Sequence, residues 1–244
     1  DRPFELPEYQ DSLVQCITAA NPNTVVLLNA GGNVDMSKWI DKVPSLLHLW
    51  YAGQEGGTAV AEILFGKVNP SGKLPISFEK KWEDNPAYPY YYDRDGDKRV
   101  EYKEGLFMGY RHYDVSETKP QFAFGYGMSY TTFKYSDLRI DREKGRDLAV
   151  KVRFTVKNTG KHDGAETAQV YIRPINPKVE RPYKELKGFA KHFIRKNAVQ
   201  EIEITLDKDA FSYYKTELKD FDYDAGSYEV LVGSASDDIR LRKV

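Results

Sequence analysis

The chain has 244 residues, of which 36 are Lys or Arg and 37 are Asp or Glu, so its formal net charge is −1. With 41% hydrophobic and 30% charged residues it has the composition of a globular protein, and its length suits one large domain or two ordinary ones. The even charge balance lacks the basic bias of nucleic-acid-binding proteins, and no apolar run reaches the roughly 18 residues that cross a membrane. We therefore expect neither nucleic acid nor a membrane as a partner.

Residues 1–80 alternate predicted helices and strands. The helices are expected over residues 7–20, 36–43 and 58–65, and the strands over residues 24–28, 45–50 and 76–78. The first two strand segments are continuously apolar, which is typical of strands buried on both faces of a parallel sheet. The β–α–β–α order predicts an α/β three-layer piece with a mostly parallel sheet over residues 1–80.

Residues 81–134 are rich in tyrosine, glycine and proline and show little periodicity. An irregular segment of this length is usually functional or wraps a neighbouring domain. Tyrosine favours wrapping, because its ring can pack while its hydroxyl stays hydrogen-bonded. We predict that residues 81–134 form a bridging segment.

From residue 135 onward, hydrophobic and polar residues alternate with period two. Predicted strands occupy residues 148–156, 167–172, 185–194, 199–206, 227–232 and 238–241. Short strands separated by turn signals predict an antiparallel β-sandwich. The single cysteine, Cys16, excludes an internal disulfide and is expected to be a buried small hydrophobe. Without paired cysteines, residues 135–244 are predicted to form an all-β fibronectin-type-III-like sandwich.

Several short motifs follow one another along the whole chain. They are NPNTVV at residues 21–26, WYAGQEGG at 50–57, GKVNPSGKLP at 66–75, YKEG at 102–105, GYR at 109–111, FGYGMSYT at 124–131, VKNTG at 156–160 and GF at 188–189. In this order they resemble the C-terminal portion of glycoside hydrolase family 3. The resemblance implies a barrel, an α/β sandwich and a fibronectin-like domain, of which this chain is similar to the end of the second and the whole of the third. The upstream barrel portion of the same protein is thus the expected partner.

The resemblance also implies a retaining β-glucosidase, whose two catalytic carboxylates lie about 5 Å apart. No residue of this chain matches the nucleophilic Asp of the barrel. Asp1-Arg2 with Leu6-Pro7 resembles the end of the loop that carries the acid/base Glu, which places that Glu three positions before Asp1. We therefore name no catalytic residue in this chain. Asp1 and Arg2 are expected either to position the acid/base loop or to form a loop ion pair without bearing on the substrate.

Two further carboxylates allow two interpretations each. Glu55 follows a predicted strand and precedes a helix, so it lies either at the ligand-facing end of the sheet or, as we favour, at a helix N-terminus. Glu104 in the bridging segment either lines the edge of the active-site cleft or pairs with Arg111, and the ion pair is favoured. The tryptophans and bridge tyrosines could stack on sugars, although Trp50 is expected in the core and Trp82 at an interface.

No cofactor and no metal site are expected. The four histidines are scattered, without a His-x-x-x-His or Cys-x-x-Cys spacing. The Gly31-Gly32 and Gly56-Gly57 pairs match no phosphate-binding pattern and are interpreted as tight turns.

The chain leaves the function open among related alternatives. A retaining exo-acting β-glucosidase that hydrolyses terminal β-D-glucosyl residues of oligosaccharides or glucosides is our first hypothesis. A β-xylosidase or N-acetyl-glucosaminidase of the same family, and a non-catalytic carbohydrate-binding or scaffold module, are the others. The resemblance favours a periplasmic or secreted bacterial protein, and a homodimer is a further expectation.

Overall fold

A computed structural model describes residues 3–94, 96–142 and 148–244. The chain divides into two compact units that alternate along the sequence. Unit 1 comprises residues 1–68, 77–105 and 117–122, and unit 2 comprises residues 69–76, 106–116 and 123–244. The contiguous limits 1–80, 81–134 and 135–244 stay a prediction.

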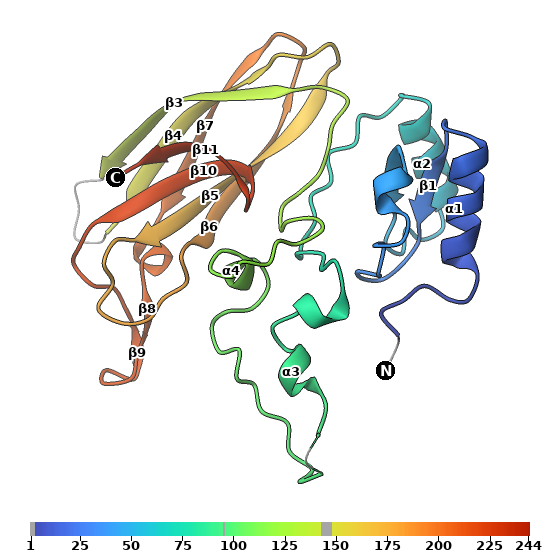
Figure 1. Ribbon diagram of the computed structural model, residues 1–244. Helices are drawn as coiled ribbons and strands as arrows, with labels where there is room; N and C mark the ends of the chain where they lie inside the picture. Colours follow the sequence, from blue (N-terminus) through green and yellow to red (C-terminus); the bar gives the residue numbers. More distant parts are fainter. Residues whose placement is uncertain (1–2, 95, 143–147) are drawn as a thin grey trace. The chain divides into compact units, whose positions relative to one another are not determined.

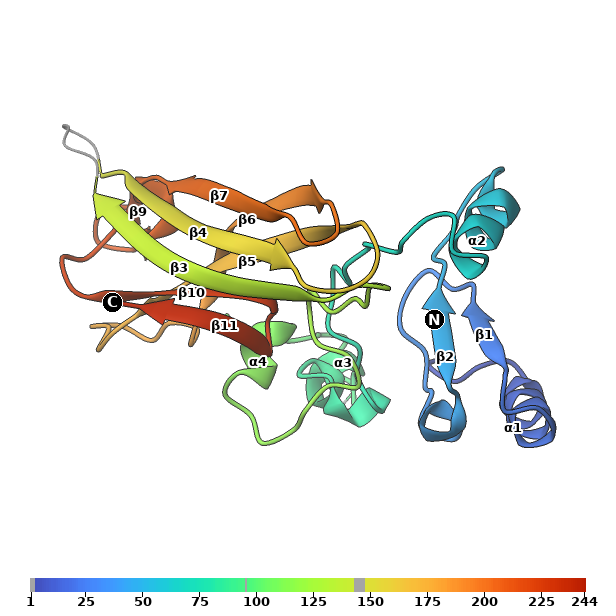
Figure 2. The same ribbon diagram turned by 90° about the horizontal axis from the view of Figure 1, so that it is seen from above.

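Unit 1 is the α/β part of the chain (Figure 1). Its elements in chain order are α1 (Gln10–Ala20), β1 (Val25–Leu28), η1 (Ile40–Lys42), β2 (Ser45–His48), α2 (Gly56–Leu64), η2 (Trp82–Asp84) and α3 (Tyr88–Tyr91). Strands β1 and β2 lie side by side and are parallel, with Val25 opposite Ser45 and Leu28 opposite His48 (Figure 2). The buried apolar side chains of this unit include Met36, Trp39 and Phe78.

The prediction of a mostly parallel sheet is not confirmed. Among the described residues only β1 and β2 pair in parallel, and every other pair of named strands is antiparallel. The strand expected over residues 76–78 is reduced to one antiparallel bridge between Phe78 and Phe122. Pro75, which precedes it, has no backbone N–H to extend a ladder.

Two other local predictions for unit 1 are wrong. The helix expected over residues 36–43 is only the 3-10 turn η1, although Met36 and Trp39 are buried three positions apart. Cys16 is exposed and not buried, since it lies on the outer face of α1 beside the exposed Ile17.

Unit 2 is an antiparallel β-sandwich. Its strands are β3 (Phe133–Arg142), β4 (Val150–Asn158), β5 (Gly164–Pro174), β6 (Glu185–Ile194), β7 (Val199–Leu206), β10 (Tyr228–Ala235) and β11 (Asp238–Lys243). One sheet has the order β3-β4-β7 and the other the order β11-β10-β5-β6 (Figure 2). The core between the sheets contains fully buried side chains such as Val152, Phe154, Val170, Ile202 and Val232. The expected all-β sandwich is confirmed.

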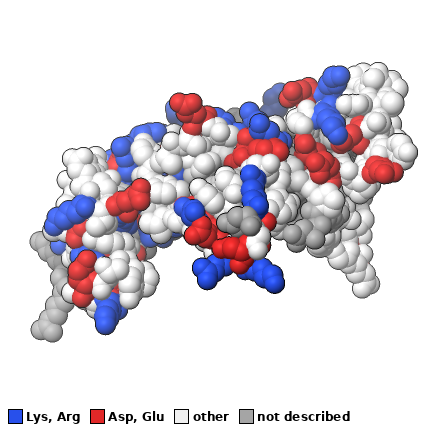
Figure 3. Space-filling view, turned by 60° about the horizontal axis from the view of Figure 1, so that its bottom comes forward, with Lys and Arg blue, Asp and Glu red and all other residues white. Residues whose placement is uncertain are grey.

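Shorter elements complete unit 2. They are α4 (Tyr110–Tyr113), η3 (Lys208–Ala210) and a hairpin of β8 (Tyr213–Lys215) and β9 (Asp220–Asp222). On the face drawn in Figure 3, basic and acidic side chains are interspersed, in line with a net charge of −1. None of the helices in the described part of the chain is long and apolar enough to cross a membrane.

Candidate functional site

The carboxyl ends of β1 and β2 are the first candidate site, because ligands of open α/β sheets bind at this edge. Residues 29–33 follow β1, and residues 49–55 follow β2. The Leu49 N–H donates to the Leu28 carbonyl at 2.8 Å, which continues the strand pairing past the end of β2. The two strand-end loops therefore leave the sheet at the same edge.

His48, the last residue of β2, joins these two loops. Its Nδ1 accepts a hydrogen bond from the Trp50 N–H at 3.2 Å, and its Nε2 lies 3.2 Å from the Gly32 carbonyl. These partners require a neutral imidazole that carries its proton on Nε2. Burial lowers the pKa of His48 below its ordinary value, against the opposing effect of the Gly32 carbonyl. The ring also packs against Trp50 and Phe78, with centroids 4.5 and 5.3 Å away.

The Tyr51 ring lies close to Gly31 at the same edge. A Cβ on Gly31 would lie 2.6 Å from a ring carbon of Tyr51, so a larger residue at this position would displace that exposed ring. Trp50 has a left-handed backbone, with φ of 53°, that turns the chain after β2. Gly31 and Gly32 form a bend after β1, and the Tyr51 ring lies close to Gly31.

Glu79 bridges the β1 loop to the segment that leads into α3. Asn33 donates from its side-chain amide to Glu79 Oε2 at 2.9 Å and to the Glu79 carbonyl at 3.0 Å. Asn85 donates to Glu79 Oε1 at 2.7 Å. Both carboxylate oxygens thus accept from neutral amides, and the half-buried Glu79 holds these two segments together.

The carboxylates singled out from the sequence lie apart from these contacts. Glu55 is exposed at the N-cap of α2 and accepts from the Thr58 hydroxyl at 3.1 Å, which agrees with its helix-terminal interpretation. Glu104 is half-buried. Asp1 and Arg2 lie outside the described residues, and their role stays a prediction.

Arg111, the residue expected to pair with Glu104, has an acidic partner within unit 2, and its pairing with Glu104 stays a prediction. Arg111, in α4 of unit 2, pairs with Glu185 at 2.9 Å, and Arg181 pairs with the other Glu185 oxygen at 3.0 Å. The Tyr110 hydroxyl accepts from the Leu186 N–H at 2.9 Å. Two consecutive residues of α4 are therefore fastened to the start of β6.

Lys184 adds a buried ion pair to this attachment. Its ammonium donates to Asp114, directly after α4, and it lies 5.7 Å from the centre of the Tyr171 ring. Burial lowers the pKa of Lys184 below its ordinary value, and Asp114 opposes that shift by favouring the charged form. The pair holds the end of α4 against the sandwich.

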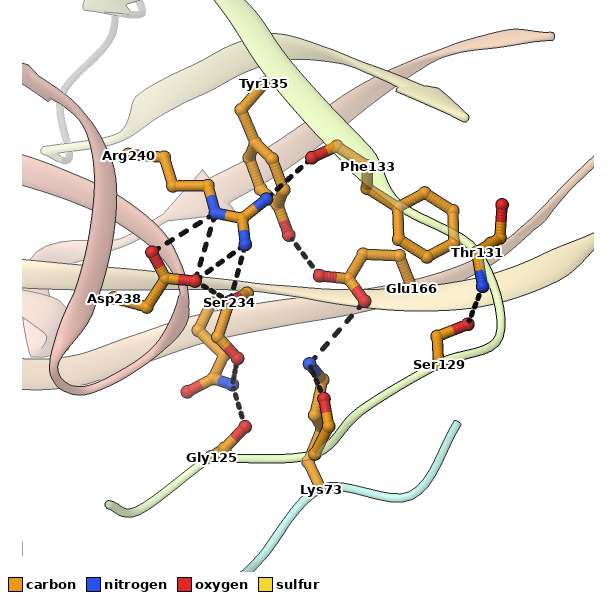
Figure 4. Close-up of polar contacts among 12 residues, drawn as sticks. Lys73, Gly125, Ser129, Thr131, Phe133, Tyr135, Glu166, Ser234, Asp238 and Arg240 are labelled. Atoms are coloured by element: carbon orange, nitrogen blue, oxygen red, sulfur yellow. Dashed lines mark hydrogen bonds and ion pairs between the residues drawn. The ribbon is translucent and has the colours of Figure 1, made fainter. Parts of the chain in front are cut away.

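A second buried network fixes residues 69–76 to the sandwich (Figure 4). Glu166 of β5 accepts from the Tyr135 hydroxyl at 2.8 Å, and its other oxygen lies 3.5 Å from the Lys73 ammonium. Lys73 also donates to the Gly127 carbonyl at 3.2 Å. The Lys73 and Glu166 side chains are only 14% and 6% exposed, so the sandwich interior holds a charged pair at one end.

Arg240 of β11 continues the network. It lies 5.1 Å from the centre of the Tyr135 ring, donates to the Phe133 carbonyl at 2.6 Å and pairs with Asp238 at 2.7 Å. The Arg240 guanidinium lowers the pKa of Asp238, and Asp238 in turn raises the pKa of Arg240. The Ser234 hydroxyl donates to Asp238 at 2.5 Å, which closes the network on β10.

The arrangement does not resemble a hydrolytic centre. Retaining glycoside hydrolysis needs two free carboxylates about 5 Å apart. The buried carboxylates of Glu166, Asp114 and Glu185 are already engaged by cations, and Glu166 also accepts from a hydroxyl group. In residues 3–94, 96–142 and 148–244, no group of three or more His, Cys, Asp or Glu is suited to a metal ion. These contacts hold segments in place.

Most of these residues carry no recognisable signal in the sequence. The four histidines are scattered along the sequence, so nothing predicts that His48 bridges two loops. No motif around Glu79 predicts its contacts with the two side-chain amides. Glu166 could have been identified from the sequence. It lies two and four positions before Ala168 and Val170 in the same strand, so its side chain is on the face that points into the core. A charged residue at such a position predicts a buried partner, although the sequence does not say that the partner is Lys73.

Comparison with known proteins identifies the family of both parts of the chain. The family model "Glycosyl hydrolase family 3 C-terminal domain" matches residues 1–130. A second family model, "Fibronectin type III-like domain", matches residues 166–236.

The similar proteins are β-glucosidases. Thermostable beta-glucosidase B of Acetivibrio thermocellus is 44% identical over 241 residues, which cover 98% of this chain and 32% of that protein. The crystal structure of a β-glucosidase from Kluyveromyces marxianus has a TM-score of 0.92 at 41% identity and covers 99% of this chain and 28% of that one. The structure of beta-glucosidase 3B from Thermotoga neapolitana in complex with glucose has a TM-score of 0.89 at 34% identity, over 98% of this chain and 34% of that one. The chain thus spans about a third of the length of these relatives.

Proposed function

This chain belongs to glycosyl hydrolase family 3, and on that premise we propose that it is the C-terminal part of a retaining, exo-acting β-glucosidase. The observation that carries the proposal is its match over nearly its whole length to proteins named β-glucosidase. Its substrates are terminal β-D-glucosyl residues of oligosaccharides or glucosides. Its nucleophilic Asp and acid/base Glu lie upstream of Asp1.

The contacts within the chain support a scaffold role for it. Tyr110, Arg111 and Asp114 are attached to the sandwich, and Lys73 is held by Glu166. Segments 69–76 and 106–116 interrupt unit 1 in sequence, and both belong to the compact unit that contains the sandwich. The sandwich therefore acts as a buttress for segments that enter and leave the α/β part, and does not read the substrate.

The upstream part of the same protein is the partner in this proposal. Apolar side chains of α1 and β1 stay exposed in the chain by itself, with Leu13 at 57% and Leu27 at 44%. Exposed apolar surface of this kind is typical of an interface. The upstream part supplies the catalytic carboxylates and covers such surface.

The test is a substrate panel on the full-length protein. We expect turnover of an aryl β-glucoside, with the β-anomer of glucose as first product, because two displacements retain the configuration. Higher kcat/KM on an aryl β-xyloside or an aryl N-acetyl-β-glucosaminide would replace the glucosidase by a related activity. Absence of turnover on all three substrates would favour a non-catalytic carbohydrate-binding or scaffold module and refute the proposal.

A further inference from the structure

An aromatic cluster on the surface of unit 1 has no part in the attachments described above. It consists of Trp82, Tyr88, Tyr90, Tyr91 and Tyr92, from η2, α3 and the residue after α3. Trp82 packs edge-on against Tyr88 and Tyr91, with ring centroids 5.7 and 5.2 Å apart, and Tyr91 packs edge-on against Tyr92 at 5.0 Å. Tyr90, Tyr91 and Tyr92 are 36%, 40% and 53% exposed. The half-buried Trp82 is thus the base of a set of outward rings.

The backbone beneath the aromatic cluster is held in one conformation. The Asn85 side chain accepts from the Ala87 N–H at 2.9 Å, and its carbonyl accepts from the Tyr88 N–H at 2.9 Å. The Asn85 amide is also bound to Glu79, which is tied to the β1 loop. Pro89 fixes the backbone within α3. The rings are therefore positioned before any ligand arrives, which reduces the entropy lost on binding.

Charges near the aromatic cluster select the class of ligand. The Arg94 guanidinium lies 5.5 Å from the centre of the Tyr88 ring, and the Lys103 ammonium lies 5.6 Å from the centre of the Tyr90 ring. Lys103 also pairs with Glu101, which offsets its charge. The two cations lie over Tyr88 and Tyr90, and among the described contacts no cation lies over the more exposed Tyr91 and Tyr92. The outermost part of the cluster therefore suits a neutral ligand.

A pyranose ring has the matching chemistry. One of its faces presents C–H groups to an aromatic ring, and its rim presents hydroxyls that can bond to phenol groups. The exposed tyrosines of the cluster combine an apolar ring with a hydroxyl, which is the pairing that a sugar ring needs. We propose that the aromatic cluster binds a neutral β-linked glucosyl oligosaccharide, with one sugar ring stacked on Tyr91 or Tyr92. The choice of a glucosyl chain rests on the proposed function.

Binding of cellotetraose to the 244-residue chain tests this proposal. Tryptophan fluorescence and calorimetry should both show saturable binding, because Trp82 contacts Tyr91. Tyr91→Leu and Tyr92→Leu keep apolar volume but remove the ring, and each should weaken binding about tenfold, equivalent to roughly 1.4 kcal/mol. Tyr91→Phe and Tyr92→Phe keep the ring and should stay within about twofold to threefold of the wild type.

The matched control is Tyr214→Leu in β8. Tyr214 is 51% exposed and packs edge-on against Phe221 at 5.4 Å, so it is an exposed aromatic pair outside the cluster. This variant should bind cellotetraose as the wild type does. Absence of saturable binding to the wild type, wild-type binding by the Leu variants of the cluster, or an equal loss in Tyr214→Leu would each overturn the proposal.

Failure of this inference is distinguishable from failure of the proposed function. Binding is measured without hydrolysis, so an inactive full-length protein would refute the β-glucosidase while binding at the cluster stands. Preference for maltotetraose over cellotetraose would refute the β-linked ligand and would leave the activity test unaffected.

Discussion

Replacing Lys73 by Met isolates the buried ion pair that fixes residues 69–76 to the sandwich. The substitution keeps an unbranched apolar stem but removes the ammonium that lies 3.5 Å from Glu166 Oε2 and donates to the Gly127 carbonyl. Glu166 then stays inside the sandwich with the Tyr135 hydroxyl as its remaining described partner. A buried carboxylate without its cation should destabilise unit 2.

The expected loss follows from the geometry of the pair. Removing one partner of a buried ion pair usually costs about 3–5 kcal/mol. Here the separation of 3.5 Å is long, and the Tyr135 hydrogen bond at 2.8 Å remains. We expect Lys73→Met to lower the free energy of unfolding by about 2–4 kcal/mol. Glu166→Gln in addition should restore roughly half of the loss, because no uncompensated charge is then buried.

Urea unfolding measures this change separately for the two units. Far-UV circular dichroism follows the strands, which lie mostly in unit 2, whereas Trp39, Trp50 and Trp82 all lie in unit 1. The dichroism midpoint should fall more than the fluorescence midpoint. Exposed Lys161 provides the control, since Lys161→Met should change stability by less than about 0.5 kcal/mol. An equally small change in Lys73→Met would refute the reasoning.

Three further outcomes are expected. Burial favours the neutral form of His48 in the folded chain, so the free energy of unfolding should fall as the pH drops below about 6.5, where a protonated Nδ1 can no longer accept from the Trp50 N–H. A urea midpoint by fluorescence that is unchanged between about pH 7.5 and about pH 5, or that falls equally in His48→Asn, would contradict this. Burial raises the pKa of Tyr135 and Tyr171, so their contribution to the free energy of unfolding is complete below pH 10.0 and is lost at higher pH. Tyrosinate absorbance should rise together with loss of the dichroism signal, and ionisation of all tyrosines without unfolding would argue against this. The chain by itself should associate through the exposed apolar residues of α1, and a monodisperse monomer by light scattering at high concentration would rule this out.

The sandwich was largely predictable from sequence. The predicted bounds of β6 and β7 coincide with the structure, and β4 and β11 differ by two residues or fewer at each end. Alternation with period two is a local signal that turn residues delimit, so it needs no knowledge of distant partners. The parallel pair β1 and β2 was also expected from their continuously apolar runs.

Contacts between distant segments were not predictable. Lys73 lies in a Gly-Pro-rich loop that is typical of a solvated turn, and its burial depends on Glu166, 93 positions later in the chain. His48 bridges two loops through backbone groups, which leave no trace in side-chain spacing.

Hydrolysis of an aryl β-glucoside by separately prepared parts tests the central claim most directly. Under the proposed function, the 244-residue chain alone lacks both catalytic carboxylates, and the upstream part alone has both but lacks the sandwich that we propose as its scaffold. Each part by itself should therefore give turnover at the level of a buffer blank. Mixing or co-expressing the two parts should restore turnover towards that of the full-length protein. Turnover well above the blank by the 244-residue chain, in material free of the upstream part, would contradict the account.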